Sequence, residues 1–153
     1  MKNFFIILLV PILLMGCSKN VSYEPQEINP EIDVCEVCNM SITEVHFATQ
    51  LISKDGEVYK FDDVGCMIEF VEKNESIEKN QIAKQYVRDF NSGDWVELKD
   101  AYHVYDPDIW TPMANGIVSF STKESAKSFI KEQGKGEIYD FEKLKTHTWS
   151  WSK

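Results

Sequence analysis

The chain has 153 residues, with 25 Asp and Glu against 16 Lys and Arg, and a formal net charge of −9 at pH 7. This acidic balance argues against a protein that binds nucleic acid or adheres to anionic lipid through its charge, because both functions need clustered Lys and Arg. The length allows one domain or two small similar halves.

The first residues predict export. Lys2 precedes an apolar run over residues 4–15, which is followed by Gly and Cys17. About a dozen apolar residues are too few for a membrane-spanning helix, which needs roughly 20, so the pattern predicts a signal peptide over residues 1–16. Residues 14–17 (LMGC) look like a bacterial lipobox. We therefore expect Cys17 to be lipidated, and the mature protein to lie outside the cytoplasm, anchored to a bacterial membrane.

The next segments predict a tether, a hairpin and a helix. Residues 17–32 contain two prolines and no hydrophobic periodicity, which is typical of a flexible tether. Residues 45–53 and 57–61 are rich in β-forming residues and flank a Lys-Asp-Gly turn, which predicts two paired strands. Asp62 and Asp63 can cap a helix whose apolar face is formed by Val64, Met67, Ile68 and Val71.

The second part of the chain repeats this order. We expect strands at residues 85–90, 95–98, 101–105 and 117–120, a loop at 111–116, and a helix that begins in a capping box at residues 121–124 and ends at Gly134. The tail, from residue 137, adds a short strand. Residues 56–74 and 116–133 both run glycine, short strand, Phe, cap and helix. The pattern predicts an α+β fold of two related strand-strand-helix units, over residues 33–90 and 91–153.

The sulfur atoms are the unusual chemical feature. Exported thiols are expected to pair, but Cys35, Cys38 and Cys66 are three, so at least one stays free. A Cys35–Cys38 disulfide closes a loop too small to add much stability, and a thioredoxin-type redox pair would need a preceding strand and a following helix that the local sequence does not predict. A structural zinc site needs four ligands, and only Cys66 and three scattered histidines remain to complete one.

Copper(I) fits the remaining pattern, because this soft ion prefers thiolate and thioether ligands and accepts low coordination numbers. Met40 follows Cys38 by two residues, and Met113 lies in a loop where no helix or strand pattern needs a core residue. Met113 fits a gap between the two halves almost as well as it fits a ligand role. His46, at the start of the first predicted strand, is a further candidate that ranks below the sulfur atoms.

The other sulfur and imidazole groups are expected to be structural. Met67 and Cys66 fall on or beside the apolar face of the predicted helix, which favours packing over ligation. His103 alternates with the residues of a half-buried strand, and His147 lies in a polar tail.

Four features of the sequence occur in a fixed order: the lipobox at Cys17, Cys-x-Met at residues 38–40, FDDVGCM at 61–67 and TPMANGIVSF at 111–120. Together they resemble the NosL-type lipoproteins, which bind copper and serve nitrous oxide reductase. The resemblance covers nearly the whole mature chain. It implies two β-β-α-β units similar to a domain of organomercurial lyase, and the delivery of Cu(I) to the reductase. It also implies copper ligation by Cys38, Met40 and Met113, with Cys35 as an auxiliary thiol and a histidine or an exogenous group as a further ligand.

Two positions depart from the family pattern, which often has Gly where this chain has Asn39 and Ala114. Asn adopts left-handed backbone more readily than most residues other than Gly, so Asn39 is compatible with the pattern. Ala lacks that tolerance, and the geometry of the loop around Met113 stays open.

We therefore predict a lipid-anchored metallochaperone without catalytic turnover, which holds Cu(I) in an open site and passes it to nitrous oxide reductase or to another exported copper enzyme. Three alternatives remain. One is a thiol-disulfide enzyme that uses Cys35 and Cys38, and another is an enzyme like organomercurial lyase. The third is a copper-storing or copper-sensing lipoprotein without a reductase partner.

Overall fold

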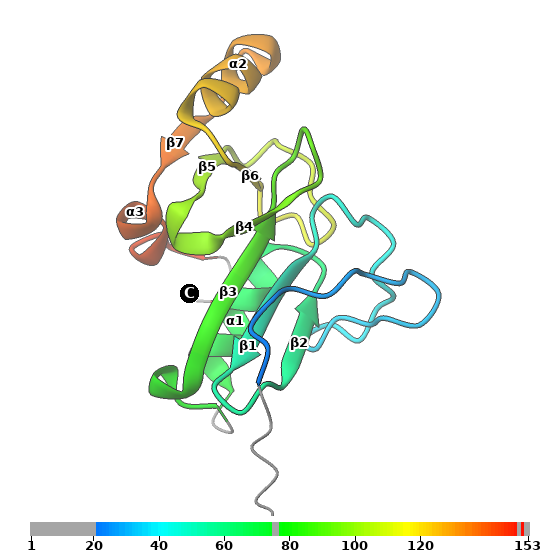
Figure 1. Cartoon of the computed structure of the whole chain (residues 1–153). Coiled ribbons are helices and arrows are strands. Elements are labelled where there is room, and N and C mark those ends of the chain that lie inside the picture. The colour runs from blue at the N-terminus through cyan, green and yellow to red at the C-terminus, as the bar shows by residue number, and fades with distance from the viewer. Residues whose placement is uncertain (1–20, 75–76, 150, 152–153) are drawn as a thin grey trace, which may run out of the picture.

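Figure 1 shows a computed structural model of the chain, which describes residues 21–74, 77–149 and 151. The expected signal peptide and Cys17 lie outside these residues. Within the described ranges the chain forms two antiparallel sheets and three α-helices, which confirms the expected mixture of helices and strands. None of the helices described is long and apolar enough to cross a membrane.

The first sheet has four strands in the order β2-β1-β3-β4, and all neighbours are antiparallel. They are β1 (Thr49–Ser53), β2 (Val58–Phe61), β3 (Ile82–Arg88) and β4 (Trp95–Glu97), with a 3-10 turn at Lys79–Gln81 before β3. The hairpin expected around the Lys-Asp-Gly turn is confirmed, but its first strand is shorter than predicted. Residues 45–47 form a turn instead, in which the Phe47 N–H donates to the Glu44 carbonyl at 2.9 Å.

Helix α1 (Val64–Lys73) packs against this sheet and begins where the sequence predicts. The Asp63 carboxylate accepts a hydrogen bond from the Cys66 N–H at 3.0 Å, which satisfies one of the free donors at the helix start. The helix buries Val64, Met67 and Phe70, and the Phe70 ring lies 5.2 Å from that of Phe61 on β2. Burial of this apolar face fixes the helix start beside the end of β2.

The second sheet has three strands in the order β6-β5-β7. They are β5 (Tyr102–Tyr105), β6 (Ile117–Phe120) and β7 (Glu137–Tyr139), with a 3-10 turn at Leu98–Asp100 before β5. Helix α2 (Lys123–Gln133) follows β6, and its cap is Thr122, one residue later than the predicted capping box. Gly134 ends the helix in left-handed backbone, as expected, and the short helix α3 (Phe141–Lys145) was not predicted.

The two sheets share one chain order. In each, a hairpin is followed by a helix and then by a strand that pairs with the first strand of the hairpin. Strand β4, although it follows residue 90, pairs with β3 of the first sheet. The larger core cluster joins both parts, because it holds Met67 of α1 together with Ile117 of β6 and Leu144 of α3.

Residues 21–32, expected to be part of a flexible tether, instead lie against the four-stranded sheet. Gln50 of β1 is a fully buried polar side chain and needs a partner. The Gln26 N–H donates to its Oε1 at 2.9 Å, and the Tyr86 hydroxyl of β3 donates to the Tyr23 carbonyl at 3.0 Å. The segment therefore supplies backbone partners to the polar groups of the sheet.

His103 of β5 is a buried histidine with a structural role, as predicted. Its Nε2 faces the Leu98 carbonyl at 3.2 Å, which can only accept, so Nε2 carries the proton and Nδ1 accepts from the Ser119 hydroxyl at 2.9 Å. Burial lowers the pKa of His103 from 6.5 to about 4. The folded protein thus holds this imidazole neutral.

Stability is expected to fall as the pH drops from 6.5 to about 4, because over that range the unfolded chain protonates His103 more readily than the folded one. At about 1.4 kcal/mol per pKa unit, the loss approaches about 3 kcal/mol. Urea unfolding at a series of pH values measures it, with His103→Asn as the control that cannot titrate. Equal pH dependence in the two proteins would contradict the assignment.

Candidate metal site

The loop of residues 34–41 carries the Cys-x-x-Cys-x-Met sequence and is closed on itself. Val34 pairs with Ser41, the Cys35 N–H donates to the Met40 carbonyl at 2.9 Å, and the Asn39 N–H donates to the Cys35 carbonyl at 2.9 Å. Asn39 has a φ of 59°, the left-handed backbone that Asn adopts more readily than most residues. The sequence thus builds a tight turn that presents both cysteines.

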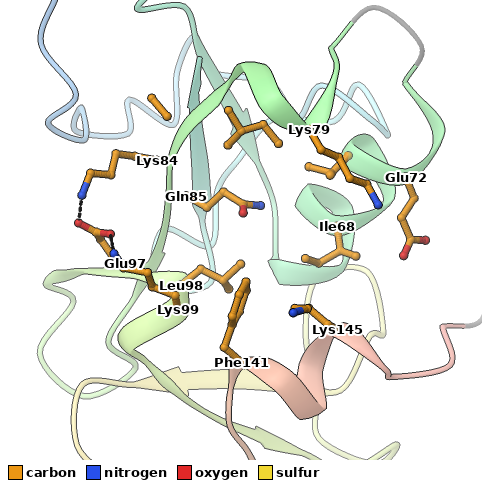
Figure 2. Close-up of a pocket in the computed structure, with 13 residues that line it drawn as sticks. Ile68, Glu72, Lys79, Lys84, Gln85, Glu97, Leu98, Lys99, Phe141 and Lys145 are labelled. Atoms are coloured by element: carbon orange, nitrogen blue, oxygen red, sulfur yellow. Dashed lines mark hydrogen bonds and ion pairs between the residues drawn. The ribbon is translucent and has the colours of Figure 1, made fainter. Parts of the chain in front are cut away.

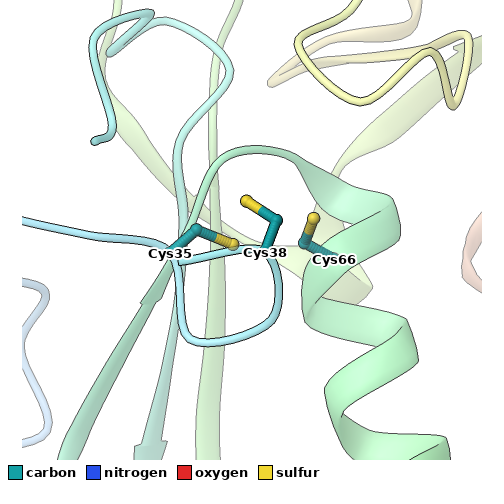
Figure 3. A group of neighbouring side chains, drawn as sticks. All are labelled: Cys35, Cys38 and Cys66. Carbon is teal, nitrogen blue, oxygen red and sulfur yellow. The ribbon is translucent and has the colours of Figure 1, made fainter. Parts of the chain in front are cut away.

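This loop meets the start of α1, where Cys66 occupies the first turn (Figure 3). The sulfur atoms of Cys35, Cys38 and Cys66 all lie within 4.8 Å of one another. Cys35 and Cys66 are buried, whereas Cys38 is partly exposed. The structure describes all three as free cysteines. Three sulfur atoms so close together form a donor set suited to a soft metal ion.

The Cys35 sulfur lies in a cradle of hydrogen-bond donors. The backbone N–H groups of Val37, Cys38 and Asp62 donate to it, and so does the Cys66 thiol. Led by the bond from Cys66, these donors lower the pKa of Cys35 to about 6, against the opposing effect of burial. Converging N–H groups stabilise an anion, so Cys35 is the member of the cluster prepared to be a thiolate.

The other two thiols are held in the protonated form. Burial, together with donation to the Asp62 carboxylate at 2.9 Å, raises the pKa of Cys38 to about 12. The contact with Cys35, followed by burial, raises the pKa of Cys66. Asp62 is itself buried, which raises its own pKa, and it contacts two of the cysteines, through its N–H and through its carboxylate.

The loop of residues 111–116, from the second part of the chain, docks at the same end of α1. The Asn115 amide donates to both oxygens of the Asp63 carboxylate, at 2.9 and 3.0 Å. Gly65 permits this approach, since a Cβ there would lie 2.1 Å from the Asn115 Nδ2. Ala114 has a φ of 54°, so this loop too has a left-handed residue, at a cost of about 1–2 kcal/mol for Ala. This contact between Asn115 and Asp63 brings the loop that carries Met113 to the start of the helix that carries Cys66.

The structure places the predicted ligands in different environments. Cys38 lies in the sulfur cluster, and Met40, at the end of the same loop, is half exposed and donates its N–H to the Cys38 sulfur. Met113 is partly buried against the larger core cluster, which includes Cys35 and Cys66. The expected Cys38, Met40 and Met113 ligand set stays a prediction.

His46 lies apart from the expected position. It is an exposed residue of the turn at residues 45–47, not of a strand, and its ring is directed toward Gly93, where a Cβ would lie 3.4 Å from it. Cys66, by contrast, was expected to be a plain core residue and is a full member of the sulfur cluster. The available signal was the odd number of thiols, which left one cysteine without a role.

A sizeable cavity of the described chain lies elsewhere. It has a volume of about 520 Å³ and lies between α1, β3 and α3, with Ile68, Leu98 and Phe141 among its apolar walls (Figure 2). Lys84 and Lys99 at its edge both pair with Glu97. None of the three cysteines lines it, so this cavity is separate from the sulfur cluster.

Comparison with known proteins agrees with the sulfur chemistry. Residues 25–149 match the model of the NosL family. The fold is similar to the crystal structure of the copper chaperone NosL from Shewanella denitrificans, with 26% sequence identity and a TM-score of 0.66, over 78% of this chain and 93% of that one. No curated protein matches. The chain belongs to the NosL family.

Proposed function

We propose that this protein is an extracytoplasmic Cu(I) metallochaperone, without catalytic turnover, that delivers copper to nitrous oxide reductase during its maturation. The observation that carries the proposal is the position of Cys38, which is partly exposed, lies within 4.8 Å of two buried sulfurs and belongs to the loop that also exposes Met40. A sulfur at this boundary can bind a soft ion and still be reached by the ligands of a partner. The similarity to a copper chaperone supports this use of the site.

Cys38, Met40 and Met113 are the proposed ligands at the surface. Thioethers need no deprotonation and do not form disulfides, which suits an oxidising compartment. The hydrogen bonds from the Asn115 amide to Asp63 support the role of Met113, because they fix the loop of residues 111–116 at the helix that carries Cys66. Cys35 contributes as an auxiliary thiol.

The partner and the location complete the proposal. Lipidation at Cys17 would hold the domain at the outer side of a bacterial membrane, close to other exported proteins. The loop of the metal site exposes Val34 and Met40, and Ile32 just before it is also exposed. Exposed apolar side chains beside a transfer site favour a transient protein contact.

We propose a common origin for the two parts of the fold. Each contains a hairpin, a helix and a third strand in the same sheet order, which supports two related β-β-α-β units with the organisation of an organomercurial-lyase-like domain. Fold alone does not imply that enzyme's chemistry.

Met40→Leu and Met113→Leu should each weaken Cu(I) binding by at least the roughly tenfold that loss of an outer-shell partner costs a metal site. Leu conserves the volume of Met, so stability should change by less than about 1.5 kcal/mol. The measurement is an anaerobic titration of the reduced protein against a chromophoric Cu(I) competitor. Met67→Leu is the matched control, because Met67 is a buried methionine of the α1 core.

The same titration tests the proposal as a whole. Tight binding of one equivalent that weakens in both surface variants, but not in Met67→Leu, supports a Cys-Met-Met site. Mixing the loaded protein with copper-free nitrous oxide reductase and measuring the copper in each separated protein then tests delivery. Binding without transfer would favour storage or sensing, and absence of binding, with a redox-active Cys35–Cys38 pair, would favour a thiol-disulfide protein.

A further inference from the structure

We propose that Cys35, Cys38 and Cys66 form a second, buried position for Cu(I), and that the ion moves between this inner position and the surface ligands by exchange at Cys38. The inference rests on the proposed function and adds a holding state to it. Cys38 is the member that both positions share. A chaperone so built protects its ion on the inner ligands and releases it from the outer ones.

The spacing of the three sulfur atoms fits a metal at their centre. Metal–thiolate bonds of about 2.3 Å place three ligands about 4 Å from one another around a trigonal ion. The three sulfur atoms already lie within 4.8 Å, so closure needs a movement of only about 1 Å or less. They come from two independently fixed elements, the closed loop at residues 34–41 and the first turn of α1.

The surroundings of Cys35 are those of a thiolate. The N–H groups of Val37 and Cys38 donate to the Cys35 sulfur from two and three residues further along the chain, and the Asp62 N–H donates from the end of the hairpin. Donors aimed at a sulfur compensate the charge that a bound thiolate brings into a buried place. Cys35 is therefore suited to be the first thiolate ligand of a cation that enters the cluster.

The imidazoles of the described residues lie away from this cluster, which favours an all-sulfur position for a soft ion. His46 faces Gly93, and His103 bonds to Leu98 and Ser119. The His147 ring packs at 4.6 Å from that of Trp149 and at 4.4 Å from that of Tyr105. A tetrahedral zinc site that needs imidazole ligands would find no imidazole at this cluster. Trigonal Cu(I) can be bound by three sulfur atoms and needs no imidazole.

The exchange balances without redox chemistry. Each thiol that binds as a thiolate releases one proton, and the proton of Cys38 leaves along its hydrogen bond to Asp62. When Met40 and Met113 replace Cys35 and Cys66, two copper–thiolate bonds break and two copper–thioether bonds form. The thiolates that leave take up protons from solvent, and copper stays Cu(I) throughout.

Cys35→Ser and Cys66→Ser test the inner position, since Ser retains the size of the side chain and a donor but is a poor ligand for a soft ion. In the reduced, Cu(I)-loaded protein each variant should lower the thiolate share of the sulfur ligands seen in X-ray absorption, because copper is then left on Cys38 and the two thioethers. Release of copper to a chelator should accelerate by roughly tenfold or more. Val64→Ala, a packing change at the start of the same helix, should do neither.

The outcomes separate the two proposals. If both serine variants keep the wild-type thiolate share and release rate while Met40→Leu and Met113→Leu weaken binding, the inner position is wrong and the surface site stands. If wild type binds no copper, the proposed function fails. A serine variant that unfolds in urea at the wild-type midpoint, yet loses thiolate ligation of copper, supports the inner position independently of packing.

Discussion

The Cys38→Ala variant should lose Cu(I) affinity by more than the roughly 10- to 100-fold that loss of an outer-shell partner costs a metal site. The reason is that Cys38 lies within 4.8 Å of both buried sulfurs and also belongs to the partly exposed loop that ends in Met40. Removing a surface thioether leaves the inner sulfurs, and removing an inner sulfur leaves the surface set. Removing Cys38 takes one ligand from each.

The measurement is the anaerobic competitor titration, applied to Cys38→Ala alone and combined with Met40→Leu. Because the single variant already disables the shared ligand, the second substitution should add little, so the two effects should be strongly non-additive. Urea unfolding checks the fold, where loss of the thiol that donates to Asp62 costs about 1 kcal/mol. Independent, additive effects of Cys38 and Met40 would show that they do not act on one ion.

Local sequence signals predicted most of the fold. The Lys-Asp-Gly turn, the Asp63 cap and the left-handed Gly134 each act within a few residues, and each is present in the structure. An error in a helix boundary arose where two neighbouring residues are almost equally good caps. Thr122, rather than the preceding Ser, caps α2, because its hydroxyl accepts from the Ser125 N–H. Both residues are good caps, so sequence alone does not choose between them.

Long-range partners explain what the sequence did not show. Residues 21–32 look like a tether because they lack periodicity, yet Gln50 is buried on β1 and takes its partner from Gln26. Nothing in either segment alone reveals that bond. Hydrophobic periodicity indicates which face of a segment is buried. It does not show which distant backbone groups form hydrogen bonds with that segment.

At the site, Cys66 is the clearest example of a residue whose role depends on a distant part of the chain. Its place beside the apolar face of α1 predicts burial, and it is buried. Burial and ligation are compatible for cysteine, and only the meeting of the helix start with the loop at residues 34–41 distinguishes them. The closure of that loop depends on the left-handed backbone at Asn39, which the family resemblance did indicate.

Gly65→Ala should destabilise the protein, although Ala favours a helix by about 1 kcal/mol over Gly. The new Cβ would lie 2.1 Å from the Asn115 Nδ2, and that amide donates to both oxygens of the buried Asp63 carboxylate. Moving it away costs about 1–3 kcal/mol in lost hydrogen bonding to a buried acceptor, which outweighs the gain in propensity. The loop that carries Met113 loses its anchor, so Cu(I) affinity should fall as well.

A double-mutant cycle with Asn115→Ala separates the clash from every other effect of Gly65. With the amide already removed, Gly65→Ala no longer meets the three atoms that lie nearest to its Cβ, all of them from the Asn115 amide. Its effect on the free energy of unfolding should then change sign, to stabilisation by up to about 1 kcal/mol. An unchanged cost in both backgrounds would mean that Gly65 does not accommodate the loop. A sign change joined to a smaller effect of Met113→Leu on Cu(I) binding would show that one contact, Asn115 on Asp63, both stabilises the fold and positions the thioether.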